Sequence, residues 1–290
     1  MKNIKKVSTT FLSSIALFVA SPAVAETELK IDYDTPSFQD KQLLSGTVEV
    51  SVKYEKTEKF SDDINNLSYQ IYYNSIPQVN SSAFTRFSGG VSLKDLDGNG
   101  IAEVIVATFS GGAHCCTNFT VYTWQNNQFS KIETGLLDGE GGIFQDLDGD
   151  GLFEFNTSDN SFLYTFSSYA GSFPPSRIYA FRNGKFENVT RKYVKQLKSR
   201  AWEMYQAFLQ NKSEPFEVNG ILAGYVAQKA LLGEYQQGWE FMLANYDRKS
   251  DWGLAIYRGD REVGKYQDFP TALESFLIEQ GYLDRDGTKR

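Results

Sequence analysis

The chain is poor in histidine and cysteine, two residue types that often carry nucleophilic or metal-assisted catalysis. Its 290 residues include one histidine, His114, and two cysteines, the adjacent pair Cys115 and Cys116. A catalytic triad would therefore have to use His114. The sequence has no Gly-x-Ser-x-Gly, P-loop or dinucleotide-binding motif. These absences favour a non-catalytic protein, and we assign no catalytic residue.

Long hydrophobic runs are also missing, except near the N-terminus. There a basic start precedes the apolar residues 11–20, and the small-x-small sequence Ala23-Val24-Ala25 ends the segment. This arrangement predicts a signal peptide over residues 1–25, with no cysteine after it to carry a lipid anchor. No later run approaches the length of a membrane span. We therefore expect an exported protein, periplasmic or secreted, with no membrane span.

Positive charge is in deficit. The chain has 29 lysines and arginines against 36 aspartates and glutamates, a formal charge of −7. The predicted signal peptide holds three of the lysines and no acid, so removing it takes the charge from −7 to −10. This sign argues against nucleic acid or an anionic membrane as a partner. It suits a protein that binds cations.

Hydrophobic periodicity changes along the chain from the spacing of strands to that of helices. Residues 47–54 alternate apolar and polar side chains, which predicts a strand with one buried face. Helical spacing appears only in the final third, over residues 194–208, 239–246 and 273–277. The sequence therefore predicts a mainly β fold with a C-terminal helical subdomain. We place the β domain at residues 26–190 and the helical part at 191–290.

Residues 86–190 contain an internal duplication. The sequence Asp95-Leu-Asp-Gly-Asn-Gly-Ile-Ala-Glu103 recurs as Asp146-Leu-Asp-Gly-Asp-Gly-Leu-Phe-Glu154, and each copy ends in a hairpin-like run. The copies, about 86–136 and 137–190, have the size of propeller blades. Two blade-like antiparallel repeats cannot form a closed propeller, even if the N-terminal strands add half a blade. Other elements must therefore cover the exposed sheet edges.

The duplicated acidic loops have the composition of calcium sites. Calcium takes six to eight oxygen ligands, and alternating acids in a tight turn supply several of them. The predicted ligands are Asp95, Asp97, Asn99, the carbonyl of Ile101 and Glu103 in the first loop, and Asp146, Asp148, Asp150, the carbonyl of Leu152 and Glu154 in the second. The cofactor expected is Ca²⁺.

Two other interpretations of these loops compete with a calcium site between strands. An EF-hand is excluded because its twelfth position holds Val106 or Thr157 in place of glutamate, and because a strand signal follows the first loop. Ordinary acidic turns are the remaining alternative, since Asp, Asn and Gly are common turn residues; the duplication favours calcium. The second loop has four carboxylates against three in the first, which predicts tighter binding there.

The first loop and its flanks also resemble a known family. Residues 87–106, from Phe87-Ser-Gly-Gly-Val through the acidic loop to Val104-Ile105-Val106, are similar to the FG-GAP (VCBS-type) repeat of integrin α-subunit propellers and bacterial surface proteins. The resemblance covers residues 86–190. It implies blades in which calcium is held between two strands by the side chains and carbonyls named above.

The segment Ser110-Gly-Gly-Ala-His-Cys-Cys-Thr117 holds all the histidine and cysteine of the chain. Three interpretations stay open: a vicinal disulfide between Cys115 and Cys116 in an oxidising compartment, free thiols packed as small hydrophobes, or a metal or redox site that includes His114. By the duplication this loop corresponds to residues 167–174. We expect both loops on the same side of neighbouring repeats, which makes that side a candidate functional surface.

The sequence thus predicts an exported calcium-binding protein of the bacterial cell envelope. It would act as a non-catalytic structural or binding module, with an unidentified protein or glycan as its ligand and calcium stiffening the repeats. The alternative of another class is an enzyme, or a redox or metal protein, centred on the loop of His114, Cys115 and Cys116.

Overall fold

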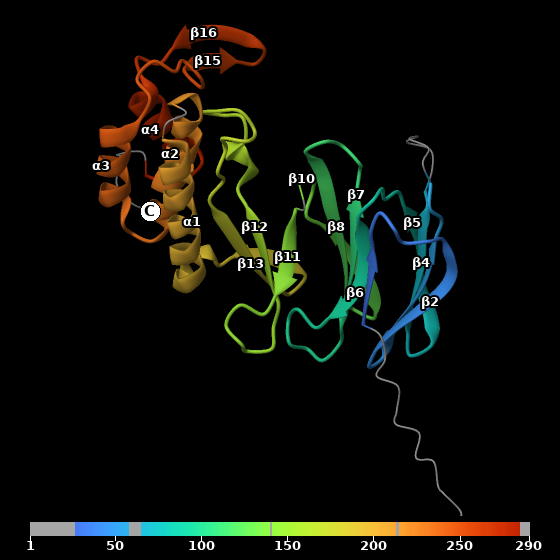
Figure 1. The fold of residues 1–290 in the computed structure, drawn as a ribbon. Helices are drawn as coiled ribbons and strands as arrows, with labels where there is room; N and C mark the ends of the chain where they lie inside the picture. Colours follow the sequence, from blue (N-terminus) through green and yellow to red (C-terminus); the bar gives the residue numbers. More distant parts are fainter. Residues whose placement is uncertain (1–26, 58–64, 140, 213–214, 285–290) are drawn as a thin grey trace, which may run out of the picture.

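A computed structural model describes residues 27–57, 65–139, 141–212 and 215–284, so the predicted signal peptide lies outside the described residues. Three antiparallel sheets follow one another along the chain, and helices come after them (Figure 1). The first sheet holds, in order, β2 (Phe38–Ser45), β3 (Val48–Tyr54), β4 (Leu67–Tyr73) and β5 (Ile76–Ala83).

The second and third sheets contain the duplicated sequence. The second has the order β1 (Glu28–Ile31), β6 (Gly89–Lys94), β7 (Glu103–Phe109), β8 (Cys115–Gln125) and β10 (Leu137–Asp138), with β9 (Gln128–Glu133) also paired to β8. The third has the order β11 (Gly142–Gln145), β12 (Glu154–Ser158), β13 (Ser176–Arg182) and β14 (Lys185–Asn188). The N-terminal strands therefore differ from the expected half-blade: they form a complete four-stranded sheet, and β1 joins the second sheet.

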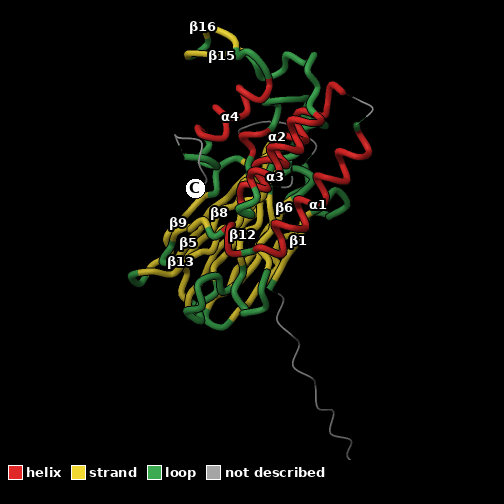
Figure 2. Tube along the Cα trace, turned by 90° about the vertical axis from the view of Figure 1, so that its left-hand side faces the viewer, coloured by secondary structure: helices red, strands yellow, loops and turns green. Residues whose placement is uncertain are grey.

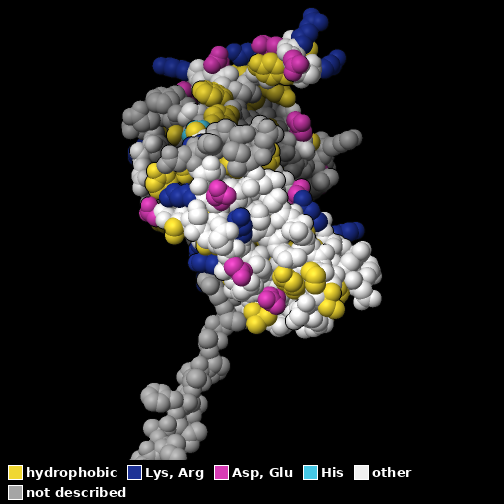
Figure 3. Space-filling view, turned by 90° about the vertical axis from the view of Figure 1, so that its right-hand side faces the viewer, with side chains coloured by type: hydrophobic (Ala, Val, Ile, Leu, Met, Phe, Trp, Pro, Cys, Tyr) yellow, Lys and Arg dark blue, Asp and Glu magenta, His cyan; other side chains and the backbone are white. Residues whose placement is uncertain are grey.

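The first sheet has one buried and one polar face. Val48, Val50 and Val52 are fully buried on β3, as their alternation predicts. They pack against side chains of the second sheet, such as Val91 and Val106, in one apolar core. The opposite face is mainly polar, with charged side chains of both signs scattered over it (Figure 3). A polar outer face ends the series of sheets without another layer.

An aromatic core joins the second sheet to the third. Phe119 of β8 makes edge-to-face contacts with Phe144 and Phe155, at ring-centroid distances of 5.7 and 5.2 Å. Edge-to-face geometry is the favoured arrangement for aromatic pairs. Each sheet is thus buried against its neighbour through the apolar face of its strands.

The C-terminal part is helical. It comprises α1 (Val194–Asn211), α2 (Pro215–Leu231), α3 (Tyr235–Asn245) and α4 (Phe269–Glu279), with a hairpin of β15 (Ala255–Arg258) and β16 (Arg261–Lys265) before α4. The helices gather at the end of the sheet series next to the third sheet (Figures 1 and 2). None of the helices that the structure describes is both long and apolar enough to cross a membrane.

These observations confirm the predicted fold class. The molecule is mainly β with a C-terminal helical region, and none of the sheets described closes into a barrel or propeller. The first sheet forms one end of the series, and the helices form the other (Figure 1).

Candidate functional site

Both acidic loops join antiparallel strands. The first connects β6 to β7 and the second connects β11 to β12, so neither is followed by the helix of an EF-hand. In the first loop the two carboxylate oxygens of Asp95 accept the backbone N–H groups of Gly98 and Gly100, at 2.8 and 2.9 Å. Both glycines have positive φ, 76° and 82°, a conformation that side chains disfavour. The Asp-x-Asp-Gly-x-Gly pattern is therefore what this turn requires.

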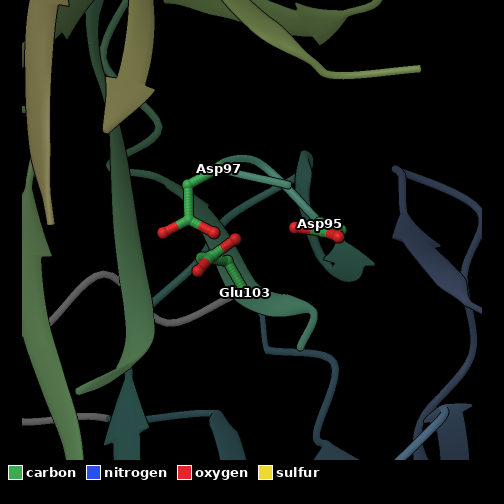
Figure 4. Close-up of side chains that lie close together, drawn as sticks. All are labelled: Asp95, Asp97 and Glu103. Carbon is green, nitrogen blue, oxygen red and sulfur yellow. The ribbon is translucent and has the colours of Figure 1, made fainter. Parts of the chain in front are cut away.

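The first loop brings three carboxylates together. Oxygen atoms of Asp95, Asp97 and Glu103 lie within 4.8 Å of one another, and the three groups converge in Figure 4. Glu103 is fully buried; its oxygens accept hydrogen bonds from the Leu96 N–H at 2.8 Å and the Thr123 hydroxyl at 2.9 Å. Burial raises the pKa of Glu103 to about 7, because a charged carboxylate loses its hydration there.

The second loop repeats this arrangement. Asp146, Asp148 and Glu154 form the equivalent group, again with oxygen atoms within 4.8 Å of one another. Glu154 is buried and accepts the Leu147 N–H at 3.2 Å, and the Tyr193 hydroxyl is also hydrogen-bonded to it. Three carboxylates held this closely could hold a metal ion, and oxygen ligands of this kind suit a hard cation. The sequence carries no motif that would have pointed to Thr123 or Tyr193 as partners.

Two further predicted side-chain ligands make backbone hydrogen bonds. The Asp150 carboxylate accepts the Leu152 N–H at 2.8 Å and lies outside the three carboxylates within 4.8 Å of one another. Asn99 accepts the Ile101 N–H at 2.7 Å. Each loop gathers three carboxylates at this spacing, and a fourth carboxylate ligand from Asp150 stays a prediction.

The two loops are neighbours. A cavity of about 440 Å³ is lined by Asp97 and Asn99 from the first loop and by Leu152 and Glu154 from the second. A Cβ at Gly98 would contact the Leu152 side chain at 3.3 Å. The loops thus stand together at one end of the second and third sheets, below the strands in Figure 1. A cation in either loop would act at the junction of two sheets.

The His114 loop lies at the opposite end of β7. The exposed His114 ring contacts the Tyr169 ring in a tilted arrangement, with ring centroids 4.0 Å apart. The backbone carbonyl of His114 accepts the Gly139 N–H at 2.6 Å. Tyr169 belongs to the loop that the duplication makes equivalent, so the two loops lie side by side. The hydroxyl of Tyr169 is hydrogen-bonded to Asp138.

Cys115 and Cys116 are paired as a vicinal disulfide in the structure. Ser110 holds this segment: its hydroxyl donates to the Cys115 carbonyl at 2.9 Å and accepts the Cys116 N–H at 2.7 Å. Among the residues that the structure describes, His114 does not belong to any group of three side chains able to hold a metal ion. The metal interpretation of this loop therefore gains no third ligand.

Comparisons with known proteins place the chain among relatives. A family model described as the sll0997 C-terminal domain matches residues 197–281, which are mainly the helical part. A probable thylakoid lumen protein, sll0997 of Synechocystis sp., is 34% identical over 89% of this chain and 84% of its own length. An uncharacterised protein, y4bJ of Sinorhizobium fredii, is 36% identical over 62% of this chain and 30% of its own length. No solved structure matches.

The resemblance to FG-GAP (VCBS-type) repeats is wrong. The matching family model falls on the helical part, and the similarity to the Synechocystis protein runs over most of the chain and far beyond the duplicated segment. The resemblance was drawn from residues 87–106 and the duplication, and its most distinctive part is the acidic turn of nine residues. Any acidic turn in which one aspartate caps two glycine N–H groups gives the same pattern, as Asp146 does with Gly149 and Gly151.

Identity above 30% across most of both chains reflects common descent over the whole fold, sheets and helices together. The chain belongs to the family of the Synechocystis protein sll0997.

Proposed function

We propose that the protein is an exported, non-catalytic binding module in which calcium, held by the two acidic loops, stiffens the second and third sheets. The observation that carries this proposal is the repetition of one arrangement: in each loop, two aspartates and a buried glutamate lie within 4.8 Å of one another. A turn that needed only its internal hydrogen bonds would not need three carboxylates at the same place.

The energetics support a cation in these loops. Three carboxylates at this spacing repel one another, and ionising the buried Glu103 costs hydration. A divalent cation offsets both effects. Carboxylate and carbonyl oxygens in an adaptable loop suit calcium better than magnesium, which demands strict octahedral geometry.

The compartment is part of the proposal. Residues 1–25 read as a signal peptide, and the Synechocystis relative is described as a probable thylakoid lumen protein. Both support a periplasmic or lumen-like location for this chain, where a disulfide such as Cys115–Cys116 persists. Extracellular-type calcium sites have dissociation constants of about 10⁻⁴ to 10⁻³ M, so they stay occupied only where calcium is abundant.

We also propose the division into a β domain at 26–190 and a helical part at 191–290. The last strand of the third sheet ends at Asn188 and α1 begins at Val194, which supports a boundary between them.

Thermal unfolding in calcium and in chelator tests this function. We compare the mature chain with Asp97→Asn/Asp148→Asn, which keeps the size of both side chains and removes one charge from each loop. Asp260→Asn, an exposed change in the β15–β16 turn, is the matched control. In about 1 mM free calcium, one site with a dissociation constant of about 10⁻⁴ M stabilises the folded chain by about 1.4 kcal/mol, which is roughly 3 to 6 °C for a chain of this size.

The wild type and Asp260→Asn should therefore melt at a higher temperature in millimolar calcium than in chelator. The double variant should melt at the same temperature in both. A wild type whose melting temperature does not respond to the chelator would contradict the proposal.

A further inference from the structure

A hollow lined by described residues lies between the third sheet and helix α1. Its volume is about 710 Å³, within the range of small-ligand sites. Strand β12 forms one wall and α1 the other, while the segments around Gly139 and Tyr169 close the end nearest His114. It is therefore separate from the acidic loops, which stand at the other end of the sheets.

The β12 wall is polar where packing would favour an apolar face. Asn156 is paired directly with Ile178 of β13, so the two side chains share one face of the sheet. Ile178 is fully buried, as expected for a sheet face covered by a helix. Asn156 and Ser158 instead line the hollow, and Asn160 continues the row. Within the described part of the chain, the side chains of these three residues make no hydrogen bond.

The facing wall, on α1, carries charged side chains that are held by contacts within the protein. Arg200 of α1 is paired with Glu203 at 3.1 Å and donates to the Pro174 carbonyl at 3.1 Å. At the end of the hollow, the hydroxyl of Tyr169 is hydrogen-bonded to Asp138. Two carboxylates against one guanidinium make the lining acidic, which disfavours an anionic ligand.

Aromatic surface completes the site. Tyr169 lines the hollow and contacts Tyr164, whose ring is exposed, at a centroid distance of 5.6 Å. Free amide and hydroxyl groups offer both donors and acceptors, which is what a neutral polyhydroxylated ligand can satisfy. A sugar ring also presents an apolar face of C–H groups that stacks on an aromatic ring. A purely apolar ligand would leave the amides unpaired, which is costly.

We propose that this hollow binds a short neutral oligosaccharide. We call it the groove from here on and define it by Asn156, Ser158, Asn160, Tyr169, Arg200 and Glu203. The inference rests on the proposed binding function and names its ligand class. It does not depend on calcium in the acidic loops, which lie at the other end of the strands.

Isothermal titration of the full mature chain tests the groove. The probes are the tetrasaccharides maltotetraose, cellotetraose, xylotetraose and chitotetraose, with a tetra-alanine peptide beside them. At least one saccharide should bind, and Asn156→Ala/Asn160→Ala should weaken its binding at least tenfold. Asn80→Ala, which changes an exposed strand asparagine of the first sheet, is the matched control and should bind as the wild type does.

The outcomes are distinct. Failure of all four saccharides to bind, or equal binding by wild type and the groove variant, would overturn the proposal, as would binding of the peptide alone. If the double variant fails to fold, Asn160→Ala alone must still weaken binding relative to Asn80→Ala. Melting in calcium and in chelator is recorded on the same samples. If the wild type binds no saccharide but melts at a higher temperature in calcium, only the groove proposal is refuted. If it binds a saccharide but its melting does not respond to calcium, only the calcium proposal is refuted.

Discussion

The carboxylate of Asp159 accepts a hydrogen bond of 2.8 Å from the hydroxyl of Tyr282, a residue that follows the last helix, α4. Arg177 of β13 donates to the same carboxylate oxygen, at 2.6 Å from its terminal nitrogen. Asp159 is buried, and so is Tyr282. This buried group fastens the end of the helical part to the third sheet.

Tyr282→Phe should weaken that attachment. The change removes one hydrogen bond to a buried charged group, and such bonds contribute about 1.5–3 kcal/mol. Urea unfolding should show a loss of that size. Tyr257→Phe, at an exposed ring of the β15–β16 hairpin, should leave the unfolding free energy unchanged. Equal stability of the two variants would mean that the Asp159–Tyr282 bond contributes nothing.

Lowering the pH should weaken the same attachment. Burial raises the pKa of Asp159, but hydrogen bonds from Ser161 and Tyr282 and the charge of Arg177 outweigh it, so the pKa lies below the ordinary value of 3.8. A folded-state pKa below the unfolded one gives stability that is present above the unfolded value and lost as the pH falls through the folded value. The difference in unfolding free energy between wild type and Asp159→Asn should thus be constant near neutral pH and shrink below about pH 4.

Asp159→Asn also controls for the other carboxylates that titrate in acid, because they are common to both proteins. A difference that stays constant down to pH 3 would show that the Asp159 carboxylate keeps no favourable interaction in the folded state.

Helix α2 approaches the segment that precedes β13 so closely that one position needs glycine. A Cβ at Gly224 would overlap the carbonyl oxygen of Phe173, and the backbone there has little freedom to move. Gly224→Ala should therefore destabilise the fold by about 1–3 kcal/mol, even though alanine favours helices. Gly264→Ala, where the added Cβ meets only the Ile256 side chain at an ordinary 3.8 Å, is the control for urea unfolding. Stabilisation by Gly224→Ala would contradict the close approach.

In the second acidic loop, the contributions of two neighbouring aspartates to calcium binding can be compared directly. Asp148 belongs to the carboxylate group, and Asp150 instead caps the Leu152 N–H. Asp148→Asn should abolish calcium binding in this loop, while Asp150→Asn should weaken it less than tenfold, since the amide oxygen can still accept the backbone bond. Calcium titration by calorimetry measures both, and a larger effect at Asp150 would favour the four-carboxylate interpretation.

Much of the β structure was predictable from local pattern. The alternation of Val48, Val50 and Val52 places β3, and the Asn126-Asn127 and Asn183-Gly184 pairs take the positive φ angles of tight hairpin turns in both copies. What pattern alone did not predict is pairing between distant segments, such as Leu29 of β1 with Val91 of β6. Register between such segments depends on the whole fold.

Sequence periodicity does not indicate helix α2, and the reason is physical. Val218, Ile221, Leu222 and Val226 are all buried, because other elements surround the helix. Because α2 is buried on most of its sides, apolar residues do not gather on one face and give little amphipathic period to detect. Asp159 and Phe162 lie in a stretch around residues 157–162 that has no counterpart in the first copy. The structure explains this stretch, because Phe162 packs into the helical core and Asp159 accepts the hydrogen bond of Tyr282.

For the acidic loops, sequence spacing named the carboxylates that the structure gathers, because a turn of nine residues fixes their positions locally. It did not separate Asp148 from Asp150, because both alternate in the same acidic pattern and only the folded loop shows that the Asp148 oxygen lies with Asp146 and Glu154. Nor could it indicate Thr123, which reaches Glu103 from the neighbouring strand β8.

Calcium content is the most direct test of the central claim. Equilibrium dialysis of the mature chain against millimolar calcium, followed by elemental analysis, counts the ions bound per chain. The account predicts two ions for the wild type, one for Asp97→Asn and none for Asp97→Asn/Asp148→Asn. A wild type that retains no calcium, or a double variant that retains as much as the wild type, would contradict it.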